Sequence, residues 1–186
     1  MNPLIAKALD EYGFIMLNQH QQLPSVCATG ETWAGFMEMI ERRQVFLTNL
    51  VEKKTTLLSP ALYAAISKKQ QPMVFDSETE PVYTFVAKNQ PVSSENIRLC
   101  LQKDKKATDK LVKKLEACLC ITVLKEGKRL NQNWGTYRWG TSIKWCKDYE
   151  AIYGALPDED FDQMMARLLQ QGISPRYCKY FTQLID

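Results

Sequence analysis

The chain has 186 residues, of which 45% are apolar and 24% charged, and its formal net charge is +3 at pH 7. A chain of this size and composition can bury a core as one moderate domain or two small ones. No apolar run approaches the roughly 18 residues of a membrane-spanning helix, and the N-terminal region carries Asp10 and Glu11 in place of the basic region that precedes the apolar block of a secretion signal. We therefore expect a soluble, cytoplasmic protein without a membrane partner.

Residues 1–80 are predicted to form an N-terminal helical, winged-helix-like subdomain. Apolar periodicity and capping residues predict a helix from Pro3 to Gly13, a strand over 14–17, a helix after Thr32 that continues over 45–51, a strand over 55–58 and a helix from Ser59. The polar residues from 68 to 80 are predicted to be a linker to the next subdomain.

Residues 81–150 are predicted to form a winged helix-turn-helix. Two short amphipathic helices flank Pro91, and Ser93 or Ser94 can cap the second. A third, basic helix is expected over 106–119, with an apolar stripe toward the core and lysines toward solvent. The residues concerned are Leu111, Leu115 and Leu119 on the buried side and Lys106, Lys110 and Lys113 on the exposed side.

A β-hairpin, the expected wing, follows the third helix. Ile121 and Val123 lie on its first strand, and Tyr137 and Trp139 lie on the return strand. The residues between the strands, which include Gly127, are predicted to form the hairpin loop.

Residues 151–186 are predicted to be a C-terminal helical segment. One helix is expected to be capped by Asp158 and ended by Gly172, and another to start at Ser174 and dock on a core. The fold class is therefore predicted as mainly α with small β-hairpins. Its architecture is a winged helix-turn-helix, to which residues 1–80 can add a second winged-helix-like subdomain.

Positive charge is concentrated on the predicted winged helix. From Arg98 to Lys144 there are twelve Lys or Arg and four Asp or Glu, a local net charge of +8, so the remainder of the chain is net acidic. This concentration indicates a polyanion such as double-stranded DNA, and an ordinary solvated face of lysines is the alternative. Cations can neutralise phosphates, and amides can reach base edges. The residues expected at the DNA are Lys105, Lys106, Lys110, Lys113, Lys128, Arg129, Asn131, Asn133 and Arg138.

The sequence contains no clear catalytic or metal-binding constellation. Six cysteines lack the spacing of a disulfide framework or zinc site, so we expect reduced thiols, no metal and no cofactor. Gln19 and Gln21 are the strongest catalytic candidates, but a glutamine is neither a useful general base nor a nucleophile. The only histidine, His20, lies between them without a visible carboxylate or serine partner. We therefore expect a polar loop there and no catalysis.

Several stretches of the chain resemble a bacterial protein group. They are Glu31-Thr32-Trp33 before a helix, residues 55–63, Pro91-Val92-Ser93-Ser94, the helix over 106–119 and Ile121-Thr122-Val123. Together they make residues 10–150 similar to the short winged-helix proteins related to the alkylpurine and crosslink-repair DNA glycosylases. The resemblance implies winged helices and DNA as the partner. Full-length members of that family excise a damaged base with a glutamine-x-glutamine or glutamine-x-aspartate pair, and Gln19-His20-Gln21 has the residue types of the first pair in the same order.

We expect a non-catalytic protein that contacts duplex DNA through the basic third helix and the wing. One alternative is a compact DNA glycosylase that flips an alkylated base toward the Gln19 loop. Another is a protein-interaction module, whose basic helix meets an acidic protein. The sequence leaves the oligomeric state, any effector ligand and any preference for a DNA sequence or lesion open.

Overall fold

The computed structural model describes residues 1–185. Over this range the chain forms nine α-helices, two short 3-10 helices and two antiparallel sheets of three strands each. The fold is therefore mixed α/β. Helices predominate as predicted, but the strands assemble into two sheets, where small hairpins were expected.

The first eight elements form a small sheet and the helices around it. They are α1 (Pro3–Tyr12), β1 (Phe14–Met16), η1 (Val26–Thr29), α2 (Trp33–Glu41), β2 (Phe46–Thr48), η2 (Val51–Lys53), β3 (Thr56–Leu58) and α3 (Pro60–Lys69). β3 is the central strand, and its Leu57 lies opposite Ile15 of β1 and Leu47 of β2. Every residue of the three strands is buried, so both faces of this sheet are covered.

Local signals set the ends of these helices where the sequence predicts them. Gly13 ends α1 in the left-handed region, with φ of 72°, and its N–H donates to the carbonyl of Leu9. The side chain of Thr32 caps α2 and that of Ser59 caps α3. Each cap satisfies a backbone N–H that the helix leaves without a partner.

The predicted continuation of the second helix over 45–51 is wrong. Arg43 adopts a left-handed conformation, with φ of 58°, after α2 has ended. Its guanidinium donates to the carbonyl of Ile40 at 2.9 Å and to that of Leu124 at 2.7 Å, which holds this turn. Residues 46–48 then pair with β3. Because these residues are all buried, apolar spacing could not distinguish a strand from a helix.

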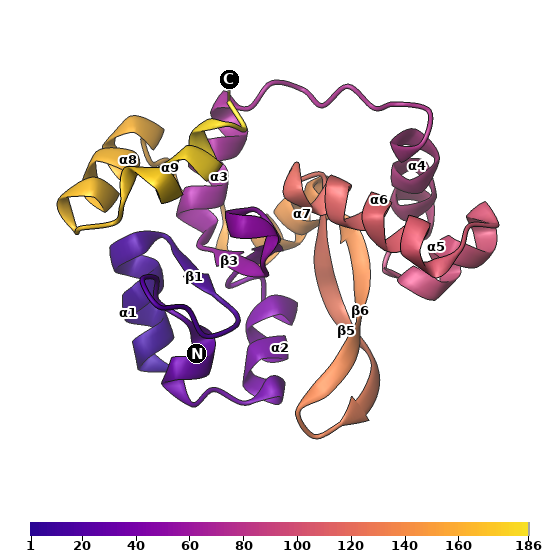
Figure 1. The fold of residues 1–186 in the computed structure, drawn as a ribbon, viewed down its shortest axis with the longest axis horizontal. Coiled ribbons are helices and arrows are strands. Elements are labelled where there is room, and N and C mark those ends of the chain that lie inside the picture. Colours follow the sequence, from indigo (N-terminus) through magenta and orange to yellow (C-terminus); the bar gives the residue numbers. More distant parts are fainter. Residues whose placement is uncertain (186) are drawn as a thin grey trace.

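The next six elements form the second sheet and the three helices against it. They are α4 (Thr79–Asn89), β4 (Val92–Ser93), α5 (Ser94–Leu101), α6 (Lys105–Ala117), β5 (Ile121–Asn131) and β6 (Trp134–Thr141). β6 is central and pairs antiparallel with β4 and β5. In Figure 1 the β5–β6 hairpin extends away from α4, α5 and α6, and α2 of the first group of elements lies beside it.

The predicted orientation of the basic helix α6 is confirmed. Leu111, Leu115 and Leu119 are buried, and Lys106, Lys110 and Lys113 are exposed. The helix itself ends at Ala117, so Leu119 lies just beyond it in a left-handed conformation, with φ of 56°. Ser93 caps α5, as predicted, and Asp104 caps α6.

The long hairpin loop predicted around Gly127 is wrong, because both strands continue past it. β5 extends to Asn131, and only Gln132 and Asn133 form the turn. Register shifts along the hairpin mark β-bulges, which hide the strand from a simple alternation pattern. A Cβ at Gly127 would lie 2.4 Å from Oγ1 of Thr136, so the glycine allows a close approach of the two strands.

Three helices complete the chain: α7 (Ser142–Tyr153), α8 (Phe161–Gln170) and α9 (Pro175–Thr182). The helix α7 was not predicted, and its buried Trp145 donates through Nε1 to the carbonyl of Val45 at 3.3 Å. Asp160 caps α8 in place of Asp158, because its carboxylate accepts from the N–H of Gln163 at 2.9 Å. The last helix docks on a core as predicted, and Figure 1 shows α8 and α9 beside α3.

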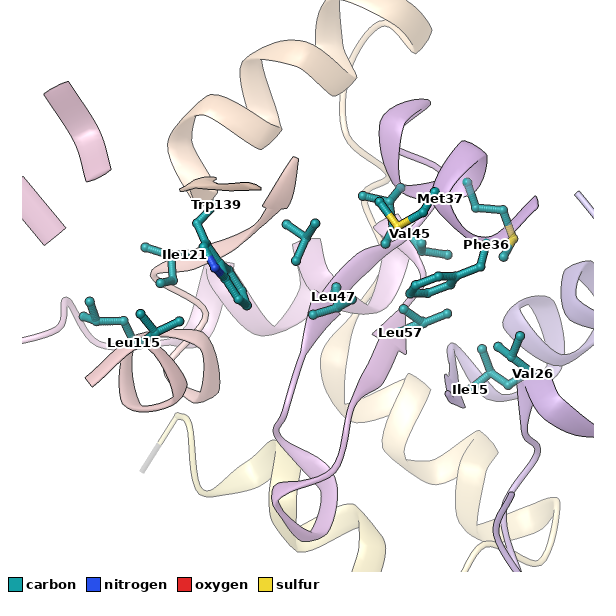
Figure 2. Close-up of a cluster of buried hydrophobic side chains, with 14 of the residues drawn as sticks. Ile15, Val26, Phe36, Met37, Val45, Leu47, Leu57, Leu115, Ile121 and Trp139 are labelled. Carbon is teal, nitrogen blue, oxygen red and sulfur yellow. The ribbon is translucent and has the colours of Figure 1, made fainter. Parts of the chain in front are cut away.

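Side chains from both sheets share one core. Figure 2 shows Leu115 and Trp139 of the second sheet and its helices in the same cluster as Leu47 and Leu57 of the first sheet. Oγ1 of Thr122 accepts from the N–H of Leu47 at 3.1 Å and donates to its carbonyl at 2.8 Å. The base of the hairpin is therefore held by β2 of the first sheet.

Candidate nucleic-acid interface

Most cations of the basic segment have no carboxylate partner. Four of the twelve Lys and Arg between residues 98 and 144 form ion pairs, namely Arg98 with Glu95, Lys114 with Asp76, Arg129 with Glu126 and Lys144 with Asp148. The other eight have no carboxylate within 4.0 Å among residues 1–185. We call them the free cations, and they are Lys103, Lys105, Lys106, Lys110, Lys113, Lys125, Lys128 and Arg138.

Seven of the eight free cations lie on α6 and on the β5–β6 hairpin, and Lys103 lies in the turn before α6. Lys106, Lys110 and Lys113 are exposed on α6 at the spacing that places side chains on one side of a helix. Lys128 of β5 and Arg138 of β6 are exposed on the hairpin. The structure therefore brings the predicted lysines of α6 together on one side of that helix.

A groove of about 560 Å³ separates the hairpin from the N-terminal ends of α5 and α6. Lys105, Lys128 and Arg138 line it, together with the acids Glu95 and Asp109. The groove is also lined by three aromatic residues of β6, Trp134, Tyr137 and Trp139. Three of the nine residues predicted at the DNA thus meet in one groove, where cations lie next to aromatic rings.

Arg129 differs from its neighbour Lys128 because a carboxylate already engages it. Its guanidinium donates to the two oxygens of Glu126 at 2.5 and 2.8 Å. Hydrogen bonds from Arg129 and from the indole of Trp33 hold the pKa of Glu126 below its ordinary value. Arg129 would have to leave this pair to contact a phosphate, whereas Lys128 would not.

Trp33 ties the hairpin to α2. Its indole N–H donates to Oε1 of Glu126 at 2.6 Å, and its ring stacks on Tyr137 with centroids 5.8 Å apart. Trp134 packs on the same ring at 5.4 Å, and Oε1 of Glu41 accepts from the N–H of Glu126 at 3.0 Å. Trp33 is buried, as its apolar segment predicts, but its contact with the hairpin spans 93 residues and has no local signal in the sequence.

The two asparagines at the hairpin tip have different surroundings. Oδ1 of Asn131 accepts from the N–H of Asn133 at 2.9 Å, so Asn131 shapes the turn. Gln132 and Asn133 are exposed and line a second hollow of about 570 Å³ beside α2. Trp134 is 51% exposed and lines both hollows. Asn133 is therefore freer than Asn131 to contact a ligand.

Glu116 is the buried acid of the basic segment. It lies on α6, is 5% exposed, and its burial raises the pKa of its carboxyl to about 8 against the opposing effect of Lys113. Burial also raises the pKa of Tyr137, and the carboxylate of Glu116 adds to that shift. A protonated Glu116 at neutral pH leaves the basic segment more positive than a count of its residues indicates.

The catalytic candidates of the early loop lie outside the groove. Gln19 and Gln21 are exposed and line neither hollow beside the hairpin. His20 does have a carboxylate partner, contrary to the prediction, since its Nε2 is 3.4 Å from Oε2 of Glu52. Its Nδ1 accepts from two backbone N–H groups later in the loop, each at 3.1 Å. His20 therefore holds the shape of this loop.

Comparison with protein-family models and with curated proteins finds no match to this chain. Over residues 1–185 no helix combines the length and the apolar character needed to cross a membrane. In the same range no three His, Cys, Asp or Glu side chains gather in a way that could hold a metal ion. The function must therefore be inferred from the charges and the groove.

Proposed function

We propose that this protein is a winged-helix protein that binds double-stranded DNA without catalysing a reaction. The element order α4, β4, α5, α6 and hairpin, with β4 in the same sheet as the hairpin, fits a winged helix-turn-helix. α6 would be the recognition helix and the β5–β6 hairpin the wing. The observation that carries this proposal is the set of eight free cations on and around these two elements.

Free cations favour a phosphate backbone as the partner. A lysine that already faces a carboxylate must give up that contact to bind a phosphate, whereas a free lysine gives up only water and salt ions. Folding has also removed much of one opposing charge, because the buried carboxyl of Glu116 has a pKa of about 8. The basic segment therefore combines a strong local charge with few internal partners to neutralise it.

The shape of the basic segment supports a duplex. An α-helix fits the major groove of B-form DNA, and Lys106, Lys110 and Lys113 extend from the exposed side of α6. Lys128 and Arg138 of the hairpin would then contact the backbone beside that groove. Asn133 at the tip is the amide best placed to reach a base edge.

We do not propose base excision at the Gln19 loop. Gln19 and Gln21 are exposed, and neither lies in the groove that holds the free cations. Catalysis on a flipped base would require a pocket that encloses the base, and Gln19 and Gln21 line neither hollow beside the hairpin. An acidic protein remains the competing partner, because it would use the same cations.

The proposal is tested by a binding isotherm with a short DNA duplex of random sequence at low salt. Lys106→Glu combined with Lys110→Glu should weaken binding by about tenfold or more. Lys53→Glu combined with Lys179→Glu is the matched control, because both lysines are exposed outside the basic segment and the change in net charge is the same. Two results would contradict the proposal. One is an equal loss of duplex affinity in both double variants. The other is duplex binding that does not depend on salt and that an acidic protein abolishes by competition.

A further inference from the structure

Duplex binding leaves the aromatic wall of the groove without an occupant. In an intact duplex the faces of the bases are stacked on one another, so a protein reaches only base edges and the backbone. Yet Trp134 at the hairpin tip is 51% exposed, and it lines the groove beside Tyr137 and Trp139. An exposed indole next to cations is typical of proteins that stack unpaired bases.

The indole of Trp134 packs against the buried ring of Trp33, with centroids 5.4 Å apart. Trp33 is itself buried, bonded through its N–H to Glu126 at 2.6 Å and stacked on Tyr137. A ligand that stacks on Trp134 would therefore meet a preorganised surface and lose little affinity to ordering it.

Cations that can bind the phosphates of a nucleotide are present in the same groove. Lys105, Lys128 and Arg138 line the same groove as Trp134 and are free cations. Two acids also line the groove. Glu95 forms an ion pair with Arg98 at 3.8 Å, so Asp109 is the one carboxylate left to offset the charge of the three cations. A volume of about 560 Å³ falls within the range of small-ligand sites and is large enough for a nucleotide.

We propose that this groove binds an unpaired nucleotide of a DNA strand, so that the protein prefers DNA in which single-stranded nucleotides adjoin a duplex. The base stacks on Trp134, and Lys105, Lys128 and Arg138 hold the adjoining phosphates. The inference rests on the proposed function, because the duplex part of the same DNA lies along α6.

Fluorescence titration tests the preference with three DNAs of the same sequence: a blunt duplex, the duplex with a short single-stranded overhang, and the single strand alone. The overhang should tighten binding by about tenfold, because it adds the stacking of one base on an aromatic side chain. Trp134→Ala should remove this gain and leave blunt-duplex affinity nearly unchanged, while Trp134→Phe should keep most of it. Leu130→Ala is the matched control, because Leu130 is 54% exposed on the same hairpin and should have no effect.

Each outcome separates the two proposals. Equal affinity for blunt and overhanging DNA, or a loss in Trp134→Ala that is the same for both, would overturn the inference and leave duplex binding intact. If the protein binds the single strand but not the blunt duplex, and Trp134→Ala abolishes that binding, the nucleotide site in the groove stands, whereas duplex binding and the preference for a junction with a duplex are overturned. A wild-type protein that binds none of the three DNAs would overturn both.

Discussion

The two sheets of this protein each have three antiparallel strands but differ in what surrounds them. In the first sheet, β1–β3–β2, every strand residue is buried. In the second sheet, β5 is buried over its first four residues and is partly or fully exposed from Lys125 onward. The first sheet is a part of the core, whereas the second has a base in the core and a tip in solvent.

Charge follows the same division. The free cations are on α6, the hairpin and the turns beside them, and the rest of the chain is net acidic. Thr122 and Trp33 connect the hairpin to the first sheet and to α2, so the exposed tip is built on a rigid base. Stability and binding should therefore depend on different residues, even within one hairpin.

The largest effect is expected from a cavity in the shared core. Leu57→Ala in the central strand β3 should lower the free energy of unfolding by about 2–5 kcal/mol, because Leu57 is fully buried between its neighbours. Leu115→Ala in α6 should cost a similar amount for the same reason. Urea denaturation measures both.

Leu130→Ala is the control for these substitutions, since it removes the same atoms from the exposed part of β5. It should change the free energy of unfolding by no more than about 0.5 kcal/mol. If Leu130→Ala destabilises the protein as much as Leu57→Ala does, the tip is not the independent surface described above.

A smaller stability effect, with a dependence on pH, is expected at Glu116. Its pKa is about 8 in the folded protein against 4.5 for an ordinary glutamate, so between these pH values the folded state holds a proton that the unfolded state lacks. Stability contributed by this proton falls as pH rises through that window, at up to about 1.4 kcal/mol per pH unit. A glutamine at this position cannot ionise, so the free energy of unfolding of Glu116→Gln should depend less on pH than that of the wild type.

At pH 8 we expect Glu116→Gln to be more stable than wild type by about 1–3 kcal/mol, less than the full linkage because a buried amide also needs hydrogen-bond partners. Thermal denaturation between pH 5 and pH 9 measures the difference. Glu150→Gln, at an exposed position of α7, should leave the profile of the wild type unchanged. If the stability of Glu116→Gln falls with pH as steeply as that of the wild type, a group other than Glu116 causes this pH dependence.

The next effect concerns binding and compares two adjacent cations of the hairpin. Lys128→Gln should remove one phosphate contact and reduce the salt slope of DNA binding by about 0.9. Arg129→Gln should have a smaller effect, because Arg129 is already paired with Glu126. Salt titration of both variants measures this order. A larger loss in Arg129→Gln would mean that the ion pair opens when DNA binds.

No effect on binding is expected from the early loop. Gln19→Ala and Gln21→Ala should bind duplex DNA as wild type does, because both side chains are exposed and outside the groove. Wild type should release no base from alkylated DNA, which chromatography of the released bases would reveal. Release that is lost in Gln21→Ala would instead support a glycosylase.

Sequence reasoning succeeded where a local signal decides the structure. The stripe of Leu111 and Leu115 gave the orientation of α6, and caps such as Thr32 and Ser59 gave helix starts. It failed over 46–48, because a strand buried on both faces has no alternation for a pattern to detect. The length of the hairpin was not predicted because its β-bulges interrupt the alternation of side chains.

The candidate site was predictable only in part. The lysines of α6 follow from charge and helical spacing, and the structure confirms that they are exposed. The groove depends on contacts between distant residues, such as Trp33 with Glu126, and on the position of Trp134 at the turn. The partner of each cation is also a tertiary property, which is why Lys128 and Arg129 look alike in the sequence and differ in the fold.

In the proposed complex, free cations of α6 and the hairpin bind the phosphates of duplex DNA. The affinity of the wild-type protein for a blunt duplex over a series of salt concentrations tests these contacts. Five phosphate contacts predict a slope of log affinity against log salt of about −4.5, and Lys128→Glu with Arg138→Glu should flatten it by about 2. A slope near zero, or one that the double variant leaves unchanged, would contradict the claim.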